Sequence, residues 1–294
     1  MTETRTPRPA DFDAYWQAVD DELARYPVAP TLERLALPSD DYSTVYGVKI
    51  TSSGPYRLFG YLSVPNGDGP FPGLLVAPGY GSVNHLPHLD DRQRYVTLIL
   101  MHRGQRLADQ PFAASYPGLL TLGIDDPASY IYRGIVADCL RGAEFLLSRP
   151  EVDAGRVGIM GNDLALITAA RRPGFSAVQA SGLLFHRLME ARTRTDAYPV
   201  EEVNDYLRTY PEQTEAVART LAYFEPRHHV STLTATTLFN GGGAGVKSVS
   251  DAVAGTVEQY ELTHEGGTDH DWADAWMARQ LGAVPKPRLW HVAS

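Results

Sequence analysis

The chain has 294 residues, of which 44% are hydrophobic and 21% charged, as is usual for a globular protein with one large α/β domain. The formal net charge of −9 argues against a nucleic-acid partner or an anionic membrane surface. A single cysteine, Cys139, excludes an internal disulfide framework and indicates a reducing cytoplasm. The first residues lack the apolar core of a signal peptide, and no apolar run reaches membrane-spanning length, so we expect a cytoplasmic protein.

Residues 1–40 are predicted to form a polar, proline-containing arm and one helix. Apolar residues recur at spacings of three and four between Asp11 and Arg25, with Asp11 in the N-cap position. Two strands joined by a Ser-Ser-Gly-Pro turn are expected next, over residues 46–51 and 56–64.

The fully apolar segment 73–77 is typical of a strand inside a covered parallel sheet, and a further strand is expected over residues 95–101. Residues 104–126 contain several glycines and prolines without periodicity, which predicts a long surface loop over one end of the sheet. An amphipathic helix follows over residues 130–147. Cys139 lies in this helix, so we interpret it as a buried structural thiol.

Strands and helices continue to alternate through the second half of the chain. The expected elements are a strand over 157–160, a helix from Leu164, a strand over 177–180, a largely helical region over 184–221, strands over 236–240 and 257–262, and a helix over 271–281. This alternation predicts one α/β domain over residues 1–294, with a mostly parallel, doubly wound sheet flanked by helices. The 104–126 loop and the 184–221 region are expected to lie over the site.

The turn after residue 160 has the pattern of a nucleophile elbow, a sharp strand-to-helix turn that usually reads Gly-x-Ser-x-Gly. The corresponding frame here is Gly161-Asn162-Asp163-Leu164-Ala165. A carboxylate therefore stands where the serine would be. Because ligands bind beyond the carboxyl ends of parallel strands, we expect Asp163 and the loop after Leu262 to meet at that edge.

Many short segments, in the right order, resemble the acetyl xylan esterase/cephalosporin C deacetylase family of α/β-hydrolases. They are residues 8–16, Pro78-Gly-Tyr-Gly, Arg103-Gly-Gln, residues 130–158, residues 206–211, Leu221-Ala-Tyr-Phe and His264-Glu-Gly-Gly. The resemblance implies an α/β-hydrolase fold, deacetylation of sugars or small acylated compounds, and a homo-oligomeric, commonly ring-shaped assembly. It therefore implies a small-molecule substrate, and we expect no cofactor.

The resemblance also carries the family's functional residues onto positions of this chain. The oxyanion-hole loop matches Gly-Tyr80-Gly, so the main-chain N–H of Tyr80 is one donor, and the N–H of Leu164 is the other. The family's histidine matches His264, and its serine matches Asp163. Its acid falls within residues 240–246, which contain no acidic residue. Two of the three triad positions therefore differ.

These differences argue against an ordinary serine esterase, which needs a hydroxyl nucleophile and an acid that orients the histidine. Two enzymatic hypotheses remain open. In an Asp-nucleophile hydrolase, Asp163 attacks an sp³ carbon, and His264 activates the water that releases the product; Asp251, Asp269 or Asp271 would then orient His264. In an acid–base lyase or cyclase, Asp163 and His264 only transfer protons.

A third hypothesis is a catalytically silent homologue that binds a ligand or has a role in assembly. His186 follows the 177–180 strand, where members of the resembled family line the pocket, so the resemblance implies that His186 lines the substrate pocket. His264, His270, Asp269 and Asp271 match no common metal-ligand spacing, so we expect no metal site. Arg103 is interpreted as a structural residue that ties loops together.

Overall fold

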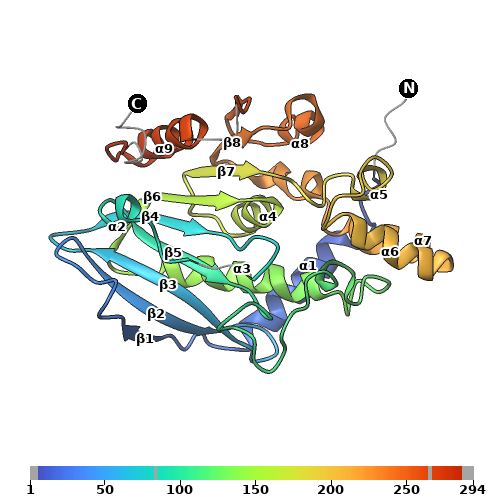
Figure 1. The fold of residues 1–294 in the computed structure, drawn as a ribbon, viewed down its shortest axis with the longest axis horizontal. Coiled ribbons are helices and arrows are strands. Elements are labelled where there is room, and N and C mark those ends of the chain that lie inside the picture. The colour runs from blue at the N-terminus through green and yellow to red at the C-terminus, as the bar shows by residue number, and fades with distance from the viewer. Residues whose placement is uncertain (1–5, 83–84, 264–266, 287–294) are drawn as a thin grey trace.

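The computed structural model describes residues 6–82, 85–263 and 267–286. These residues form a nine-stranded sheet with the order β1-β2-β3-β5-β4-β6-β7-β8-β9 (Figure 1). The strands are β1 (Thr31–Arg34), β2 (Ser43–Thr51), β3 (Arg57–Pro65), β4 (Phe71–Val76), β5 (Val96–Met101), β6 (Val152–Gly161), β7 (Ala177–Ser181), β8 (Thr236–Asn240) and β9 (Val257–Tyr260). Strands β1, β2, β3 and β5 pair antiparallel, whereas every pair from β5 to β9 is parallel. The predicted mostly parallel sheet is confirmed.

The helices of the described residues are α1 (Phe12–Ala24), α2 (Leu89–Arg92), α3 (Ile131–Leu147), α4 (Asp163–Arg171), α5 (Leu188–Ala191), α6 (Glu201–Thr209), α7 (Thr214–Ala222), α8 (Lys247–Ser250) and α9 (Gly267–Leu281). Helices α1, α3, α4 and α9 lie in segments where the sequence predicted helices, whereas the short helices α2 and α8 were not predicted. Asp11 is the N-cap residue of α1, as predicted, although its side chain makes no capping hydrogen bond. Its carboxylate instead accepts a hydrogen bond from the Tyr223 hydroxyl, 2.6 Å away.

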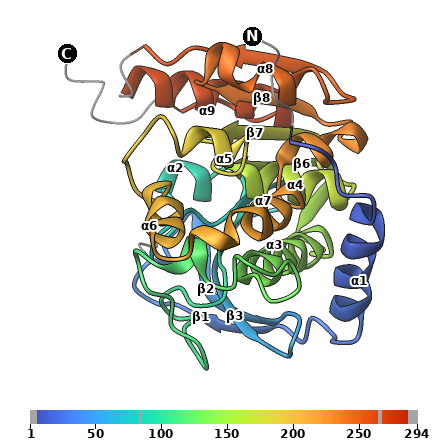
Figure 2. The same cartoon turned by 90° about the vertical axis from the view of Figure 1, so that its right-hand side faces the viewer.

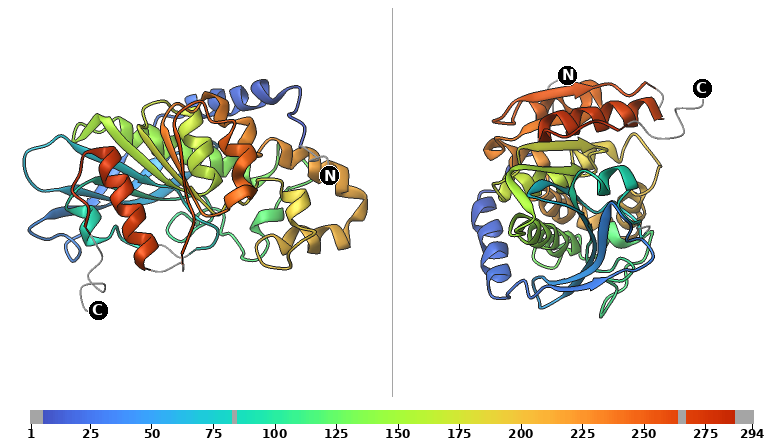
Figure 3. Two further views of the ribbon diagram at one scale, coloured as in Figure 1. Left: turned by 90° about the horizontal axis from the view of Figure 1, so that it is seen from above. Right: turned by 90° about the vertical axis from the view of Figure 1, so that its left-hand side faces the viewer.

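Helices cover both faces of the sheet. Helices α1, α3 and α4 lie on one face and α9 on the other, as the view from above shows (Figure 3). Side chains of successive strand residues point to opposite faces, and neighbours in β4 demonstrate it. Leu75 packs in the core beneath α3, whereas Leu74 packs against Trp276 and Met277 of α9. The two faces of the sheet thus carry separate hydrophobic clusters, and β4 contributes a leucine to each of them.

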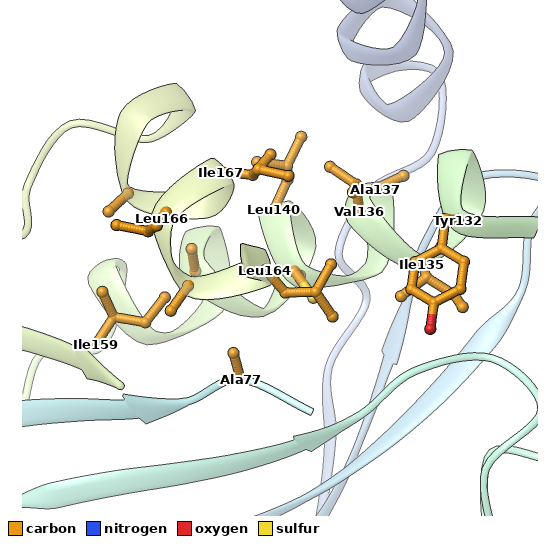
Figure 4. Packing of buried hydrophobic residues seen from close by; sticks show 14 of the residues in the cluster. Ala77, Tyr132, Ile135, Val136, Ala137, Leu140, Ile159, Leu164, Leu166 and Ile167 are labelled. Carbon is orange, nitrogen blue, oxygen red and sulfur yellow. The ribbon is translucent and has the colours of Figure 1, made fainter. Parts of the chain in front are cut away.

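The core on the α3 side continues directly beneath the elbow. Leu164 and Ile167 of α4 pack close to Leu140 of α3, with Ala77 and Ile159 from the sheet below them (Figure 4). All five side chains are buried. Full burial of an aliphatic side chain such as leucine stabilises the fold by about 1.5–3 kcal/mol, so this packing fixes where α4 begins relative to the strands.

The carboxyl ends of the parallel strands point to one end of the molecule, and α5, α6 and α7 lie at that end (Figures 1 and 2). The predicted helical region over 184–221 is only partly helical, because residues 182–187 and 192–200 contain no helix. Arg187 has a left-handed backbone with φ of 53°, which ends any helix across it. An irregular loop therefore connects β7 to α5.

Candidate functional site

The turn from β6 to α4 places Asp163 at the carboxyl edge of the sheet, where the sequence predicted it. A Cβ on Gly161 would lie 3.0 Å from the Cβ of Ala77, so glycine allows the two strands to approach closely here. Asp163 is the first residue of α4. It is not among the non-glycine residues with positive φ in the described part of the chain. The backbone therefore carries no left-handed strain at Asp163.

The carboxyl group of Asp163 points into the loop after β7. Its two oxygens accept hydrogen bonds from the main-chain N–H groups of Leu184, at 2.5 Å, and Phe185, at 3.0 Å. The residue is only 1% exposed. Burial raises the pKa of Asp163 to about 7, and the negative charge of Glu225 adds to the rise, while the two N–H donors act in the opposite direction.

The second predicted oxyanion donor is already engaged. Asn162 caps α4, and its side-chain oxygen accepts a hydrogen bond from the N–H of Leu164 at 3.0 Å. The loop that carries Tyr80 is held by Gln105, whose side-chain amide donates to the carbonyls of Gly79 and Gly81. The Tyr80 hydroxyl donates to Glu202. The oxyanion role of these two N–H groups stays a prediction.

His264 lies outside the described residues, so its pairing with Asp163 also stays a prediction. Two of the acids considered as its partner have other contacts. Asp269 accepts hydrogen bonds from the Tyr260 hydroxyl at 2.8 Å and from the N–H of Thr263 at 3.0 Å. Asp251 forms an exposed ion pair with Lys247. Asp271 lies on α9.

His186 is held by an acid that the sequence analysis did not identify. Its Nδ1 lies 2.7 Å from Oε1 of Glu225, and the two side chains are 8% and 3% exposed. The other oxygen of Glu225 accepts the N–H of Arg187 at 2.8 Å. The sequence marks Glu225 only weakly as a functional residue. The Pro226 that follows it indicates the start of a helical turn, and Glu225 is indeed the N-cap residue of the 3₁₀ turn η3 (Pro226–His228).

A cleft of about 990 Å³ opens beside these groups, between the N-terminal arm and helices α5 and α7. Phe185, Arg187 and Glu225 contribute to its wall. Neither Asp163 nor His186 is among its lining residues. The His186 ring contacts Glu225 instead, and its predicted role in a substrate pocket stays a prediction.

Other candidate groups have structural surroundings. Arg103 donates to both oxygens of Asp138, which is fully buried, and to Ser53, so it ties its loop to α3. Cys139 is buried, and burial raises the pKa of its thiol. In the part of the chain that the structure describes, no group of three or more His, Cys, Asp or Glu side chains could hold a metal ion. No described helix is long and apolar enough to span a membrane.

Comparisons of the sequence and the structure with known proteins identify the family of this chain. The family model of acetyl xylan esterase (AXE1) matches residues 2–242. The acetyl esterase Axe7A of Xylanibacter ruminicola is 29% identical over 192 residues, which cover 60% of this chain and 44% of that protein. The match thus spans less than half the length of this curated relative.

Solved structures show the same fold. The acetyl xylan esterase from Paenibacillus sp. R4 superimposes with a TM-score of 0.83 at 24% identity, covering 96% of this chain and 97% of that one. Acetyl xylan esterase 1 from a Thermoanaerobacterium species gives a TM-score of 0.80 at 20% identity, covering 94% and 95% of the two chains. The predicted α/β-hydrolase fold is confirmed. Because the family model matches residues 2–242 of the 294 residues, this chain belongs to the acetyl xylan esterase family.

Proposed function

We propose that this member of the family acts on a small molecule by proton transfer, with Asp163 as the acid–base group and His264 as its partner. The observation that supports the proposal is the pKa of Asp163, which burial raises to about 7. A general acid or base works best when its pKa lies near the working pH, because both protonation states are then populated. A lyase, isomerase or cyclase reaction needs such a group.

The alternative Asp-nucleophile hydrolase has weaker support from the same geometry. A nucleophilic carboxylate must direct a lone pair at the substrate carbon. Both oxygens of Asp163 already accept main-chain N–H groups, and the residue is 1% exposed. Hydrolysis of the covalent ester would also need an oxyanion hole, and the Leu164 N–H is engaged by Asn162.

A catalytically silent homologue is the second candidate function, and one specific observation favours it. The large cleft beside α5 and α7 is not lined by Asp163. A ligand could occupy that cleft while Asp163 serves only to hold the loop after β7. Family membership further supports a homo-oligomeric assembly, and the single cysteine supports a reducing cytoplasm; light scattering of the purified protein tests the first of these.

The deciding experiment measures the Asp163 carboxyl itself. In protein labelled with ¹³C at aspartate side chains, the signal lost in Asp163→Asn identifies this residue, and its chemical shift is followed from pH 3 to pH 9. We expect a midpoint near pH 7, together with deuterium exchange into carbon acids such as β-acetoxy ketones that Asp163→Asn abolishes. A midpoint near pH 4 removes the proton-transfer proposal. A midpoint near pH 7 favours the silent homologue if the β-acetoxy ketone shows neither deuterium exchange nor loss of acetate, and if Asp163→Asn binds this compound as well as the wild type does.

A further inference from the structure

Three side chains outside the Asp163 position form a hydroxyl–imidazole–carboxylate relay. Oγ of Ser248 lies 3.2 Å from Nε2 of His186, and Nδ1 of the same ring lies 2.7 Å from Oε1 of Glu225. The residues come from separate parts of the chain, namely α8, the loop after β7 and the residue before η3. We propose that Ser248 is a nucleophile for acyl transfer, with His186 as its general base and Glu225 as the orienting acid. This proposal does not rest on proton transfer by Asp163.

The hydrogen bonds select the imidazole tautomer that such chemistry requires. Glu225 can only accept when ionised, so Nδ1 of His186 carries the proton that it donates to Oε1. The lone pair of Nε2 then faces the hydroxyl of Ser248. This is the arrangement by which a Ser–His–acid triad removes a proton from its serine, and it recurs on unrelated folds.

The relay is held rigidly at its acid end. Oε2 of Glu225 accepts the N–H of Arg187 at 2.8 Å, and Glu225 is 2% exposed. Arg187 keeps a left-handed φ of 53°, a strained conformation for a non-glycine residue that persists only where its surroundings fix it. The bond to Glu225 is one such constraint, and it sets the direction of the neighbouring His186 ring.

One short loop connects this relay to the altered elbow. Leu184 and Phe185 donate their N–H groups to Asp163, and the next two residues, His186 and Arg187, are bound by Glu225. Two buried carboxyl groups therefore hold consecutive halves of the loop. A serine at position 163 has one side-chain oxygen and could not hold both N–H groups in the same way. Whatever proton transfer it performs, Asp163 also positions the loop that carries His186.

In a nucleophilic site the nucleophile must be accessible to substrate, whereas its base and acid can be buried. Ser248, His186 and Glu225 differ in exposure in this way. His186 and Glu225 are nearly buried, so their interaction is screened little by water. Ser248 is half-buried and adjoins the exposed Lys247. A small substrate would therefore meet the hydroxyl first, while the base and the acid remain behind it.

The reaction balances with water as the only co-reactant. Oγ of Ser248 forms a bond to the carbonyl carbon of a small acyl ester, and its proton passes to Nε2 of His186. The bond from that carbon to the alkoxy oxygen breaks, and the departing oxygen takes the proton from Nε2. Water then repeats both steps on the acyl-serine to release the carboxylic acid, with no change in oxidation state.

A fluorophosphonate tests the nucleophile without knowledge of the substrate. In the full-length protein, attack by Ser248 forms a phosphorus–oxygen bond and expels fluoride, which intact mass and peptide mapping detect. We expect one label on Ser248 and none in Ser248→Ala. The matched control is Ser250→Ala, on the same short helix, whose hydroxyl donates to the carbonyl of Lys247 instead of contacting a histidine.

The acid end is tested by Glu225→Gln, with thermal unfolding to verify that the variant folds. Loss of a triad acid lowers the rate of serine hydrolases by about 10⁴-fold, so we expect Glu225→Gln to slow both labelling and p-nitrophenyl acetate turnover by at least about 100-fold. No label on Ser248, or equal labelling in folded Glu225→Gln, overturns the proposal and leaves Ser248 as a mere hydrogen-bond partner of the ring. Neither outcome bears on the titration of Asp163.

Discussion

The main-chain N–H of Phe185 donates a hydrogen bond to the carboxyl group of Asp163 across 3.0 Å, so the elbow residue fastens the loop that follows β7. Together with the bond from Leu184, this contact occupies both carboxyl oxygens. Asp163 thus has a structural task, whatever chemistry it also performs.

The stability of the protein should fall as pH rises through the Asp163 titration. Burial raises the pKa of this carboxyl from 3.8 to about 7 in the folded chain, so the folded state binds more protons than the unfolded state between these values. The stability contribution is then complete below pH 4 and is lost as pH approaches 7 and above. A difference of about three pKa units corresponds to a loss of about 4 kcal/mol in the free energy of unfolding between low pH and pH values above 7.

The measurement is urea unfolding of the wild type and Asp163→Asn from pH 4 to pH 8.5. Buried His102 and His229, whose pKa values burial lowers to about 4 and about 3, produce an opposite slope, but it is common to both proteins and cancels in their difference. We expect the stability advantage of the wild type to be greatest near pH 4 and to shrink towards pH 8. An advantage that is constant or grows with pH would contradict the raised pKa.

Removing the charge of Asp138 should destabilise the fold strongly. Asp138 is fully buried and bound by Arg103 through Nε at 2.9 Å and Nη2 at 2.8 Å. Breaking one partner of a buried ion pair typically costs about 3–5 kcal/mol, and we expect that loss for Asp138→Asn in urea unfolding. The control is Asp251→Asn, which breaks the exposed pair with Lys247 and should change stability by less than about 1 kcal/mol. Similar losses for both variants would refute the structural role of Arg103.

The positions of most elements could be predicted because the sheet is covered on both faces. All six residues of β5 are buried, and the corresponding run, Val-Thr-Leu-Ile-Leu-Met, is recognisably a buried strand. Strand β1 was missed for the opposite reason. Its four residues, Thr31–Arg34, are all exposed at the edge of the sheet, so no alternation of polar and apolar residues marks them.

The site was predictable in position but not in contacts. The glycine frame located Asp163 after β6, yet the direction of its carboxyl depends on main-chain N–H groups, which nearly every residue possesses and which leave no trace in the sequence. His186 was singled out by its place after β7. Its partners Glu225 and Ser248 are 39 and 62 residues away, and only the fold brings them to the ring.

Truncation of Trp16 should detach α1 from the core. Trp16 is completely buried, donates its indole N–H to the carbonyl of Tyr223, and packs edge-on against Phe224. Replacing a buried tryptophan by alanine removes this packing at a cost of about 3–5 kcal/mol. We expect Trp16→Ala to lose that much in urea unfolding, whereas exposed Tyr42→Ala should stay within about 0.5 kcal/mol. Equal effects would mean that α1 is not docked as described.

Placing a serine at position 163 should not by itself create an esterase at the elbow. In Asp163→Ser the new hydroxyl would lack a triad acid, whose loss in serine hydrolases lowers the rate by about 10⁴-fold. The Leu164 N–H would still donate to Asn162, so one oxyanion donor would remain engaged. The loop after β7 would also lose a carboxyl that accepts both of its N–H groups.

The assay uses p-nitrophenyl acetate in a Ser248→Ala background, so that the relay of His186 and Glu225 cannot contribute turnover. We expect Asp163→Ser in this background to match its parent within experimental error, and to remain inactive when Asn162→Ala also frees the Leu164 N–H. If the added serine alone raises turnover by more than about 100-fold, a carboxylate already orients a histidine at the elbow, because a serine without that support loses most of its rate. The elbow would then be a complete catalytic frame in which only the nucleophile has been exchanged.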